Sequence, residues 1–399
     1  MLSEQSTPVI RTTLPVVGAA IGDIAELFYT KLFDDRPELR RDLFNRGNQA
    51  SGEQQKALAG SIAAFASMLV EHPEARPDAM LARIANKHAS LGITSDQYKL
   101  VHQHLFSAIG DVLGEAVTDE VAAAWDEVYW LMANALIAIE ARLYQGSGTA
   151  EGEIWHQMEI AERREETPDT VSLVLRRADG RPAGSFRPGQ YVSVQVQLPD
   201  GARQIRQYSL SCAPGSPQWR ITVKRVRGAA TPEGEVSSWL HEHARVGHSL
   251  TVSAPFGDLV LPEDEGPLLL VSAGVGVTPM LAMLNHLASE ATSRPVTVVH
   301  AERTPVDHAH REEQHRLVQA LPNATLHLWY EEPGAEVRPE ASTGRADVTT
   351  LDLPMGITAY LCGPLPFMRA VRSDLLRRGL PAASIHYEVF GPDLWLGGE

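Results

Sequence analysis

The spacing of apolar residues changes twice along this chain of 399 residues, and each change predicts a different kind of structure. Up to about Arg142 the apolar residues recur every three or four positions, which predicts amphipathic helices. From about Ile154 to Leu261 they alternate with polar residues between turn sequences, which predicts a small antiparallel barrel. From Leu268 onward short apolar runs alternate with helical segments, which predicts a parallel sheet. We therefore expect three domains, over residues 1–147, 152–262 and 266–399.

Local sequence refines the ends of these domains. Thr94 with Gln97 matches a capping box, and Thr118 is expected to cap the helix that follows it. Residues 146–149, with the sequence Gly-Ser-Gly-Thr, are expected to form a short flexible linker. The apolar stretch 14–21 is similar to the core of a signal peptide, but helical spacing continues through Asp23 and Glu26, which favours a helix of the folded protein.

Composition excludes several functional classes. Acidic residues outnumber basic ones by 50 to 35, so the average field repels nucleic acid and anionic lipid. The two cysteines, Cys212 and Cys362, form no CxxC pair and exclude a disulfide framework or a zinc ribbon. No apolar run reaches the ~18 residues of a membrane span, and the expected location is the cytoplasm.

Two glycine-containing turns of the last domain suggest a nucleotide site. Residues 274–279, Gly-Val-Gly-Val-Thr-Pro, follow an apolar strand directly, so their backbone N–H groups could approach a pyrophosphate at a helix start. Cys362-Gly363-Pro364 repeats the arrangement after the strand at Tyr360 and Leu361. One such turn is equally compatible with an ordinary strand-to-helix connection, but two in one α/β unit favour a dinucleotide.

The barrel carries two further candidate motifs. Arg206 and Tyr208 share one face of a strand that also holds Gln207 and Ser209, so a planar cofactor and its phosphate could bind there. Residues 234–240 begin a helix whose N–H groups could bind an anion. A solvated strand and an ordinary capped helix are the alternatives for each motif taken alone.

In the helical domain, four polar residues are placed toward the core. His88 is in register with Leu81 and Ile84, and a buried imidazole needs a partner. Gln54 precedes Leu58 by one helical turn, although residues 51–54 also fit a capping box. The phenols of Tyr29 and Tyr98 need partners as well, which backbone carbonyls could equally provide.

Taken together, these motifs resemble the flavohaemoglobin family across essentially the whole chain. The first domain is similar to a globin, through Phe28-Tyr29, Leu43-Phe44-Asn45, Gln54, Leu58, Lys87-His88 and Tyr98. The other two are similar to a ferredoxin–NADP reductase type module, an antiparallel β-barrel that binds FAD followed by an α/β domain that binds NAD(P). Its motifs here are Arg206-x-Tyr208-Ser209, residues 234–238 and 274–279, Cys362-Gly363-Pro364 and residues 387–392.

For the globin, the resemblance implies a haem b site. His88 would be the iron ligand, with Tyr98 and Glu140 beside its imidazole, where a carboxylate strengthens the donor. Tyr29, Gln54 and Leu58 would form the distal pocket, with the Tyr29 hydroxyl donating a hydrogen bond to bound oxygen. Phe44 would pack against the porphyrin.

For the reductase module, the resemblance implies sites for FAD and for NADH or NADPH. Flavin contacts are expected from Arg206 at the pyrophosphate, Tyr208 and Ser209 at the ring, Tyr191 near the adenine end and Phe390 over the other ring face. Phosphate contacts are expected from Gly234, Val236 and Ser237, and dinucleotide contacts from Gly274, Thr278, Cys362 and Gly363. The remaining motif positions expected to line these sites are Gln207, Gly276, Pro279, Gly391 and Pro392.

Two places leave questions open. Residues 228–233 form a longer approach to the Gly234 motif than the family usually has, which predicts a loop insertion beside the flavin. After the second strand of the last domain, Glu302 would favour a free ribose 2′-hydroxyl, whereas Arg303 could accept a 2′-phosphate.

The resemblance implies a nitric oxide dioxygenase that detoxifies nitric oxide to nitrate, with electrons passing from NAD(P)H through FAD to haem. The expected partners are small molecules only, and the expected state is a monomer. Two other functions compete. An oxygen-binding or sensing globin would not need Arg206, Gly274 and Phe390, and a reductase for other electron acceptors would not need Tyr29 and Gln54 opposite His88.

Overall fold

The computed structural model describes residues 1–74, 76–228, 233–334 and 341–392. The chain divides into two compact units. The first holds Met1–Trp155, Gln195–Arg206, Gly391 and Pro392, and the second holds His156–Val194 and Gln207–Phe390. The expected loop insertion at residues 228–233 falls mainly outside the described residues, and the expected domain limits remain predictions.

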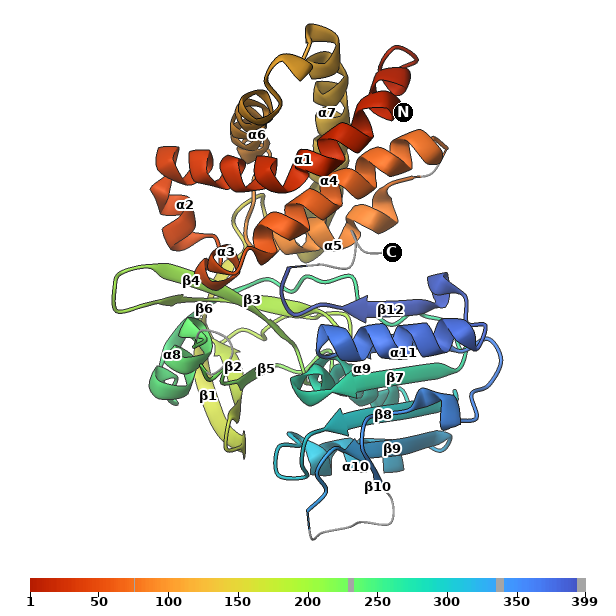
Figure 1. Cartoon of the computed structure of the whole chain (residues 1–399). Helices are drawn as coiled ribbons and strands as arrows, with labels where there is room; N and C mark the ends of the chain where they lie inside the picture. Colours follow the sequence, from red (N-terminus) through yellow and green to blue (C-terminus); the bar gives the residue numbers. More distant parts are fainter. Residues whose placement is uncertain (75, 229–232, 335–340, 393–399) are drawn as a thin grey trace. The chain divides into compact units, whose positions relative to one another are not determined.

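The first unit is helical, as the spacing of its apolar residues predicts (Figure 1). Phe28, Phe65, Leu81 and Trp125 are buried in one apolar core. The helix α1 packs against α4, α6 and α7, and α5 packs against α7. Its α-helices are α1 (Ser6–Asp35), α2 (Pro37–Asp42), α3 (Arg46–Ala50), α4 (Glu53–Glu71), α5 (Asp78–Ala89), α6 (Gln97–Leu113) and α7 (Asp119–Ser147), with a 3₁₀ turn at Gly114–Ala116.

Local side-chain bonds set several helix ends. The Thr118 hydroxyl accepts a hydrogen bond from Val121 N, which confirms the predicted cap of α7. The Gln97 side chain accepts from Thr94 N at 2.8 Å, one of the two bonds of the predicted capping box. The predicted linker is wrong in its first half, because α7 continues through Ser147 and ends where Gly148 takes a left-handed φ of 70°.

The middle of the chain, where a barrel is predicted, forms a six-stranded sheet. The strand order is β4-β3-β6-β1-β2-β5, with β1–β2 and β2–β5 antiparallel. A bridge from Leu210 to Ile221 joins the end of β4 to β5, the two outer strands of this order. The strands are β1 (Trp155–Thr167), β2 (Thr170–Arg177), β3 (Tyr191–Gln197), β4 (Arg203–Ser209), β5 (Trp219–Lys224) and β6 (Ser249–Ser253), and α8 (Glu235–His243) follows β5.

The second sheet is parallel and lies between helices, as the buried apolar runs predict (Figure 1). Its order is β10-β9-β8-β7-β11-β12, so the order along the chain reverses between β7 and β11. Such a reversal leaves a crevice at the carboxyl ends of the two strands, where α/β proteins bind nucleotides. The elements are β7 (Leu268–Ala273), α9 (Val277–Ser289), β8 (Val296–Glu302), α10 (Arg311–Gln319), β9 (Ala324–Tyr330), β10 (Ala341–Thr343), β11 (Thr358–Cys362), α11 (Leu365–Arg377) and β12 (Ile385–Glu388), with short 3₁₀ turns at Gly274–Gly276, Val348–Thr350 and Ala382–Ser384.

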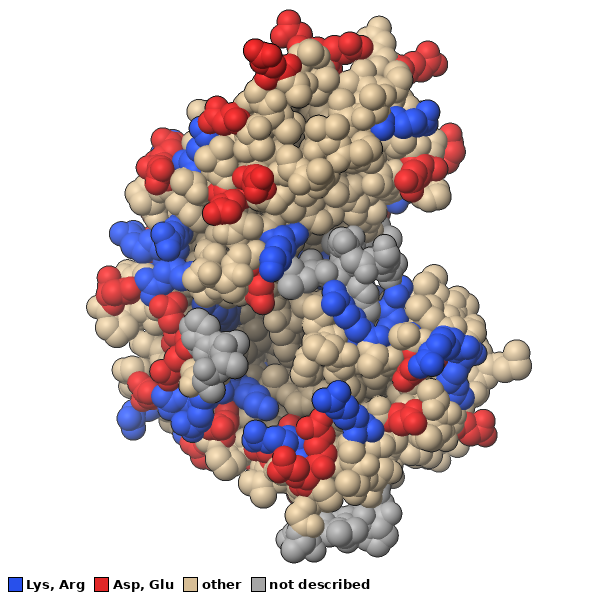
Figure 2. Space-filling model, viewed as in Figure 1, with Lys and Arg blue, Asp and Glu red and all other residues tan. Residues whose placement is uncertain are grey.

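Three further observations concern the whole described chain. Both cysteines are free thiols. Among the described helices none is both long enough and apolar enough to cross a membrane. Figure 2 shows acidic side chains prominent over the helical unit on the face in view, in keeping with the net charge of −15.

Candidate functional site

In the helical unit, α5, α6 and α7 bring three polar side chains together. Nδ1 of His88 lies 2.9 Å from Oε1 of Glu140 and 2.9 Å from the Tyr98 hydroxyl. The Tyr98 hydroxyl also donates to the same Glu140 oxygen at 2.6 Å. Burial, reinforced by the charge of Glu140, raises the pKa of Tyr98 far above its usual value, so the phenol keeps its proton.

This arrangement indicates which nitrogen of His88 is available to a metal. A buried carboxylate at Nδ1 favours the tautomer that carries its proton there, and the lone pair is then on Nε2. Iron-binding histidines take this form, because an acceptor at the second ring nitrogen orients the ring and makes it a stronger ligand. The described residues contain no cluster of three or more His, Cys, Asp or Glu suited to a metal ion. A haem needs one protein ligand, and the Nε2 atom of His88 fits that need.

The second polar group of this unit lies on α1 and α4, which pack against each other. Tyr29 is 5% exposed, and a side-chain hydrogen bond joins it to Gln54. Burial raises the pKa of Tyr29 well above its usual value, so its hydroxyl is a protonated donor. Phe44 contacts Tyr29 edge to face at 5.7 Å, and Leu58 lies one helical turn after Gln54. The structure thus places the three predicted distal residues, Tyr29, Gln54 and Leu58, on two helices that pack together, with Phe44 in contact with Tyr29. The alternative capping box fails, since Gly52 rather than Ser51 precedes α4.

In the barrel, β4 places the predicted flavin residues. Arg206 and Tyr208 are two residues apart on this strand and therefore share a face. Gln207 lies between them, and Ser209 follows Tyr208. The Gln207 amide donates to Ser193 Oγ at 2.8 Å, so this side chain also holds β3. Tyr191, at the start of β3, is 7% exposed and forms a bridge with Phe256. Phe390 is 48% exposed, which is unusual for a phenyl ring. This exposure is what we expect of a side chain that a bound cofactor would cover.

The start of α8 is crowded in a way that only glycine permits. A Cβ at Gly234 would lie 2.5 Å from Ser237 Oγ and 2.8 Å from Val226 Cβ. Ser237 Oγ accepts from Val226 N and donates to Gly234 O, each at 3.1 Å, which fixes the turn. Val236 is buried beneath it. The helix start is therefore held in a fixed shape, and such a helix start can bind an anion such as a phosphate.

In the parallel sheet, the two glycine-containing turns predicted to bind a dinucleotide lie against each other. A Cβ at Gly276 would be 2.3 Å from the carbonyl oxygen of Cys362 and 2.8 Å from Gly363 N. These backbones meet beside the strand-order reversal between β7 and β11. Thr278 and Pro279 are buried in the first turn of α9, and the Thr278 hydroxyl donates to Val275 O. The crevice is therefore shaped for close approach of a dinucleotide backbone.

Two charged residues near these turns, Glu388 and Lys224, were given no role from the sequence. Glu388 is 7% exposed, accepts a hydrogen bond from Ser209 at 3.5 Å and stands opposite Cys362 in the β11–β12 register. Burial and the charge of Glu388 raise the pKa of the Cys362 thiol. Lys224, the last residue of β5, and Glu302, the last of β8, both lie beside Gly274. Glu388 lies in the motif at residues 387–392, whereas Lys224 gave no sequence signal, because its contact joins parts of the chain that are distant in sequence.

The fold and these sites define an oxidoreductase that combines a haem-binding helical domain with a flavin- and nicotinamide-binding module. Three family models match successive parts of the chain: the globin family over residues 26–136, the oxidoreductase FAD-binding domain over 157–260 and the oxidoreductase NAD-binding domain over 270–373.

Full-length relatives agree with this division. A flavohemoprotein of Rhizobium meliloti (strain 1021) is 40% identical, with 99% of this chain and all of the relative covered. The flavohemoprotein of Bordetella parapertussis is 41% identical over 98% of this chain and 99% of its own. The solved flavohemoglobin of Malassezia yamatoensis, with bound FAD and haem, has a TM-score of 0.88 and 37% identity, covering 98% of this chain and 100% of its own. The FAD/NAD binding domain of nitric oxide dioxygenase from Vibrio cholerae O1 biovar El Tor is 38% identical and covers 59% of this chain and 99% of its own, with a TM-score of 0.56.

This chain belongs to the flavohemoprotein family. The expected fold, a globin domain with an antiparallel FAD-binding domain and a parallel NAD-binding domain, is confirmed. The expected cofactors, haem, FAD and a nicotinamide dinucleotide, are confirmed as those of its three domain types.

Proposed function

We propose that this protein is a nitric oxide dioxygenase that uses NAD(P)H to convert nitric oxide and oxygen to nitrate. The observation that carries the proposal is the pairing of two sites in one helical unit: His88 bonded through Nδ1 to Glu140, and the buried donor Tyr29 bonded to Gln54. A reductase module in the same chain supplies the electrons that repeated turnover needs. Membership of a family whose Vibrio cholerae relative is described as a nitric oxide dioxygenase supports the same reaction.

The residues of the haem, flavin and dinucleotide sites would have separate and chemically consistent roles in this reaction. When bound, the three cofactors supply hydride donation, separation of a hydride into single electrons, and oxygen binding at an iron. His88, oriented by Glu140 and Tyr98, would hold the haem iron through Nε2. Tyr29 and Gln54 would offer hydrogen bonds to a substrate atom that gains negative charge during the reaction. Arg206, the α8 start at Gly234 and the turn at Gly276 hold phosphates and orient the rings.

The balanced reaction gives a direct test. Two nitric oxide and two oxygen molecules with one NAD(P)H give two nitrate ions, one NAD(P)⁺ and one proton. We expect nitrate to form in a ratio of two per NAD(P)H consumed, measured by ion chromatography alongside the loss of 340 nm absorbance. Donor oxidation without nitrate would favour the alternative function, a reductase for other electron acceptors.

Tyr29→Phe is expected to release oxygen faster than the parent protein. A hydrogen bond to an acceptor that gains negative charge is worth ~1.5–3 kcal/mol, so the release rate should rise by about one to two decades. Stopped-flow displacement of oxygen from haem-loaded protein measures this rate. Tyr144→Phe is the matched control, because its buried hydroxyl donates to Ile93 O elsewhere in the unit. An equal release rate in Tyr29→Phe and the parent would remove the proposed role.

The structure also favours NADH over NADPH at the dinucleotide site. Glu302 ends the second strand of the sheet, where an acidic residue binds a free ribose 2′-hydroxyl and repels a 2′-phosphate. Burial raises its pKa, while Lys224 acts in the opposite direction. The Arg303 guanidinium, the candidate phosphate ligand, is bound instead to Asp307 through Nε at 3.2 Å and Nη2 at 3.0 Å.

We therefore expect a lower KM for NADH, and expect Glu302→Gln to improve NADPH use selectively. Removing one like-charge contact should lower the KM for NADPH by about tenfold, equivalent to ~1.4 kcal/mol. Flavin reduction by each donor measures the effect, and Glu312→Gln, an exposed acid in the first turn of α10, is the control. An unchanged ratio of the two KM values would argue that Glu302 does not contact the ribose.

Cytoplasmic location, a monomeric state and a partner set limited to small molecules remain part of this proposal. They rest on the net charge of −15 and on the absence of an apolar span in the sequence. An oxygen-binding or sensing globin is the other alternative, and the reductase module weighs against it, because binding alone requires no electrons.

A further inference from the structure

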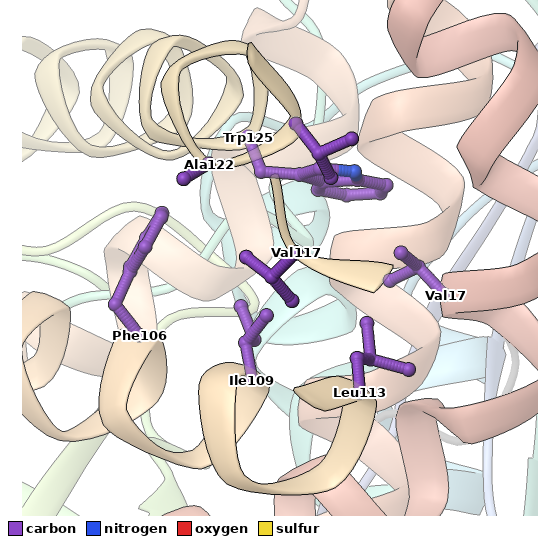
Figure 3. A pocket seen from close by; sticks show the side chains of 8 residues that line it. Val17, Phe106, Ile109, Leu113, Val117, Ala122 and Trp125 are labelled. Atoms are coloured by element: carbon purple, nitrogen blue, oxygen red, sulfur yellow. The ribbon is translucent and has the colours of Figure 1, made fainter. Parts of the chain in front are cut away.

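The two units differ in what their interiors contain. The helical unit encloses an apolar cavity of about 110 Å³ between α1, α6 and α7, whose lining includes Val17, Ile109 and Trp125 (Figure 3). The second unit contains a buried polar network that joins strands of the FAD-binding barrel to the helix α10. The His310 network, as we call it, consists of His310, Glu313, Arg220, Thr222, Ser172 and Glu166.

His310 is bonded on both sides of its ring. Its side chain is 2% exposed, and it precedes α10 with a left-handed φ of 59°, which residues other than glycine rarely adopt. Nε2 lies 2.9 Å from the Thr222 hydroxyl and 3.3 Å from the Ser172 hydroxyl. Nδ1 lies 3.4 Å from Glu313 and 3.5 Å from Glu166. Carboxylates only accept hydrogen bonds, so these contacts favour a hydrogen on Nδ1.

Glu313 continues the network from α10 to the barrel. Its two carboxylate oxygens accept hydrogen bonds from both terminal nitrogens of Arg220, at 2.7 and 2.9 Å. Asn285 of α9 donates to the same carboxylate at 3.2 Å. Burial alone would raise the pKa of Glu313, but the hydrogen bonds from His310 and Arg220 hold it well below its usual value. The carboxylate therefore keeps its charge and binds three elements at once.

The network lies between the elements that place the flavin and the dinucleotide. Ile221, between Arg220 and Thr222 on β5, forms a bridge with Leu210, the residue directly after the flavin-site strand β4. Strand β5 also contacts the turn at Gly274–Gly276, which leads into α9. The His310 network therefore fixes β5 against α9 and α10, away from the residues expected to touch either cofactor.

Hydride transfer is sensitive to this placement. A C–H bond of the nicotinamide breaks as an N–H bond forms on the flavin, and two electrons pass with one proton to leave NAD(P)⁺ and the reduced flavin anion. Such a step requires reacting atoms about 3–3.5 Å apart, and misplacement by about 1 Å can cost 10²-fold in rate. The FAD-binding and NAD-binding domains hold one ring each. A change in the angle between these domains would therefore separate the rings without removing a contact from either binding site.

We propose that His310 is a positioning residue for hydride transfer: through Glu166, Glu313 and Thr222 it holds the NAD-binding domain at the angle to the barrel that brings the two rings together. His310 itself would touch neither cofactor and acts through β5 and α9. The proposal rests on the flavin and nicotinamide cofactors and not on the reaction with nitric oxide, so either can fail without the other.

His310→Phe keeps the volume of a ring and removes its polar atoms. In anaerobic holoprotein we expect hydride transfer at saturating NADH to slow by at least about tenfold, while the Kd for NADH stays within about twofold of the parent value. Stopped-flow bleaching of the flavin over a range of NADH concentrations separates these two constants. His248→Phe, at an exposed histidine of the same unit, is the control and should match the parent. A hydride-transfer rate in His310→Phe equal to that of the parent would overturn the proposal.

Thr222 provides a second test, which also serves if His310→Phe does not fold. Thr222→Val removes the hydroxyl that bonds to His310 but nearly keeps the shape of the side chain, whereas Thr222→Ser keeps the hydroxyl and loses a methyl group. We expect Thr222→Val to slow hydride transfer and Thr222→Ser to stay close to the parent. The reverse order, or equal rates in the two variants, would mean that the bond to His310 does not position the rings, and would overturn the proposal.

Stacking of the two rings can also be measured without turnover. NAD⁺ added to holoprotein that dithionite has reduced is expected to give a long-wavelength charge-transfer band when the nicotinamide lies on the flavin. This band should weaken in His310→Phe and Thr222→Val at unchanged flavin content, and should persist in Thr222→Ser. A normal band in His310→Phe and Thr222→Val, with only a lower midpoint of urea unfolding, would give the His310 network a purely structural role and contradict the proposal.

Discussion

His88→Ala is expected to fold with its flavin but without haem. His88 is the one residue of its cluster with a nitrogen lone pair available to iron, because Nδ1 keeps its proton and donates it in a hydrogen bond to Glu140. Removing a residue that hydrogen-bonds to a metal ligand already lowers metal affinity by about 10–100-fold. Removing the ligand itself should lower the affinity further. Helix α5 should persist, since Leu81, Ala85 and Ala89 keep it packed in the core.

The ratio of Soret to flavin absorbance in purified protein measures this loss. His102→Ala is the matched control, a histidine on α6 whose Nε2 lies 2.6 Å from Asp126. It should retain a normal haem content. In His88→Gly, added imidazole should restore haem binding by supplying the missing ligand. A normal haem content in His88→Ala would refute the assignment of the iron ligand.

Gly276→Ala is expected to abolish reduction of the flavin by NAD(P)H while leaving haem in place. The added methyl would lie 2.3 Å from the Cys362 carbonyl oxygen, and both neighbours are backbone atoms that cannot turn aside. The turns after β7 and β11 must therefore separate, and displacement of a positioning group by about 1 Å can cost 10²-fold in rate. We expect at least this loss.

Anaerobic stopped-flow bleaching of the flavin by NADH measures the rate, and flavin content reports whether the second unit still folds. Gly110→Ala is the control for the substitution itself, because a Cβ there meets nothing within 4 Å. Normal bleaching in Gly276→Ala would mean that the dinucleotide does not depend on contact between these two turns.

Much of the fold followed from the spacing of apolar residues. Buried runs such as Leu268 to Val271 became parallel strands, and alternation at Val192 to Val196 became a barrel strand. The linker at residues 146–149 was misjudged because Gly146 is tolerated inside α7, where Tyr144 anchors the last turn through its bond to Ile93. Glycine content alone does not show which of two nearby glycines will take a positive φ.

The sites were less accessible to sequence reasoning. Helical register placed His88 toward the core, but only the resemblance to flavohaemoglobins suggested Glu140 as its partner, 52 positions away. The contact between Gly276 and Cys362, and the approach of Glu388 to Ser209, depend on which strands become neighbours. Strand order is a property of the folded sheet, so no local pattern could predict these contacts.

The central claim is most directly tested with a nitric oxide electrode and protein loaded with haem and FAD. In air-saturated buffer, addition of NADH should start rapid loss of nitric oxide, with NADPH slower and no donor giving only one brief turnover. Under argon, or with His88→Ala, the loss should fall to the background rate. Persistence of nitric oxide in air while NADH still reduces the flavin would contradict the proposed dioxygenase.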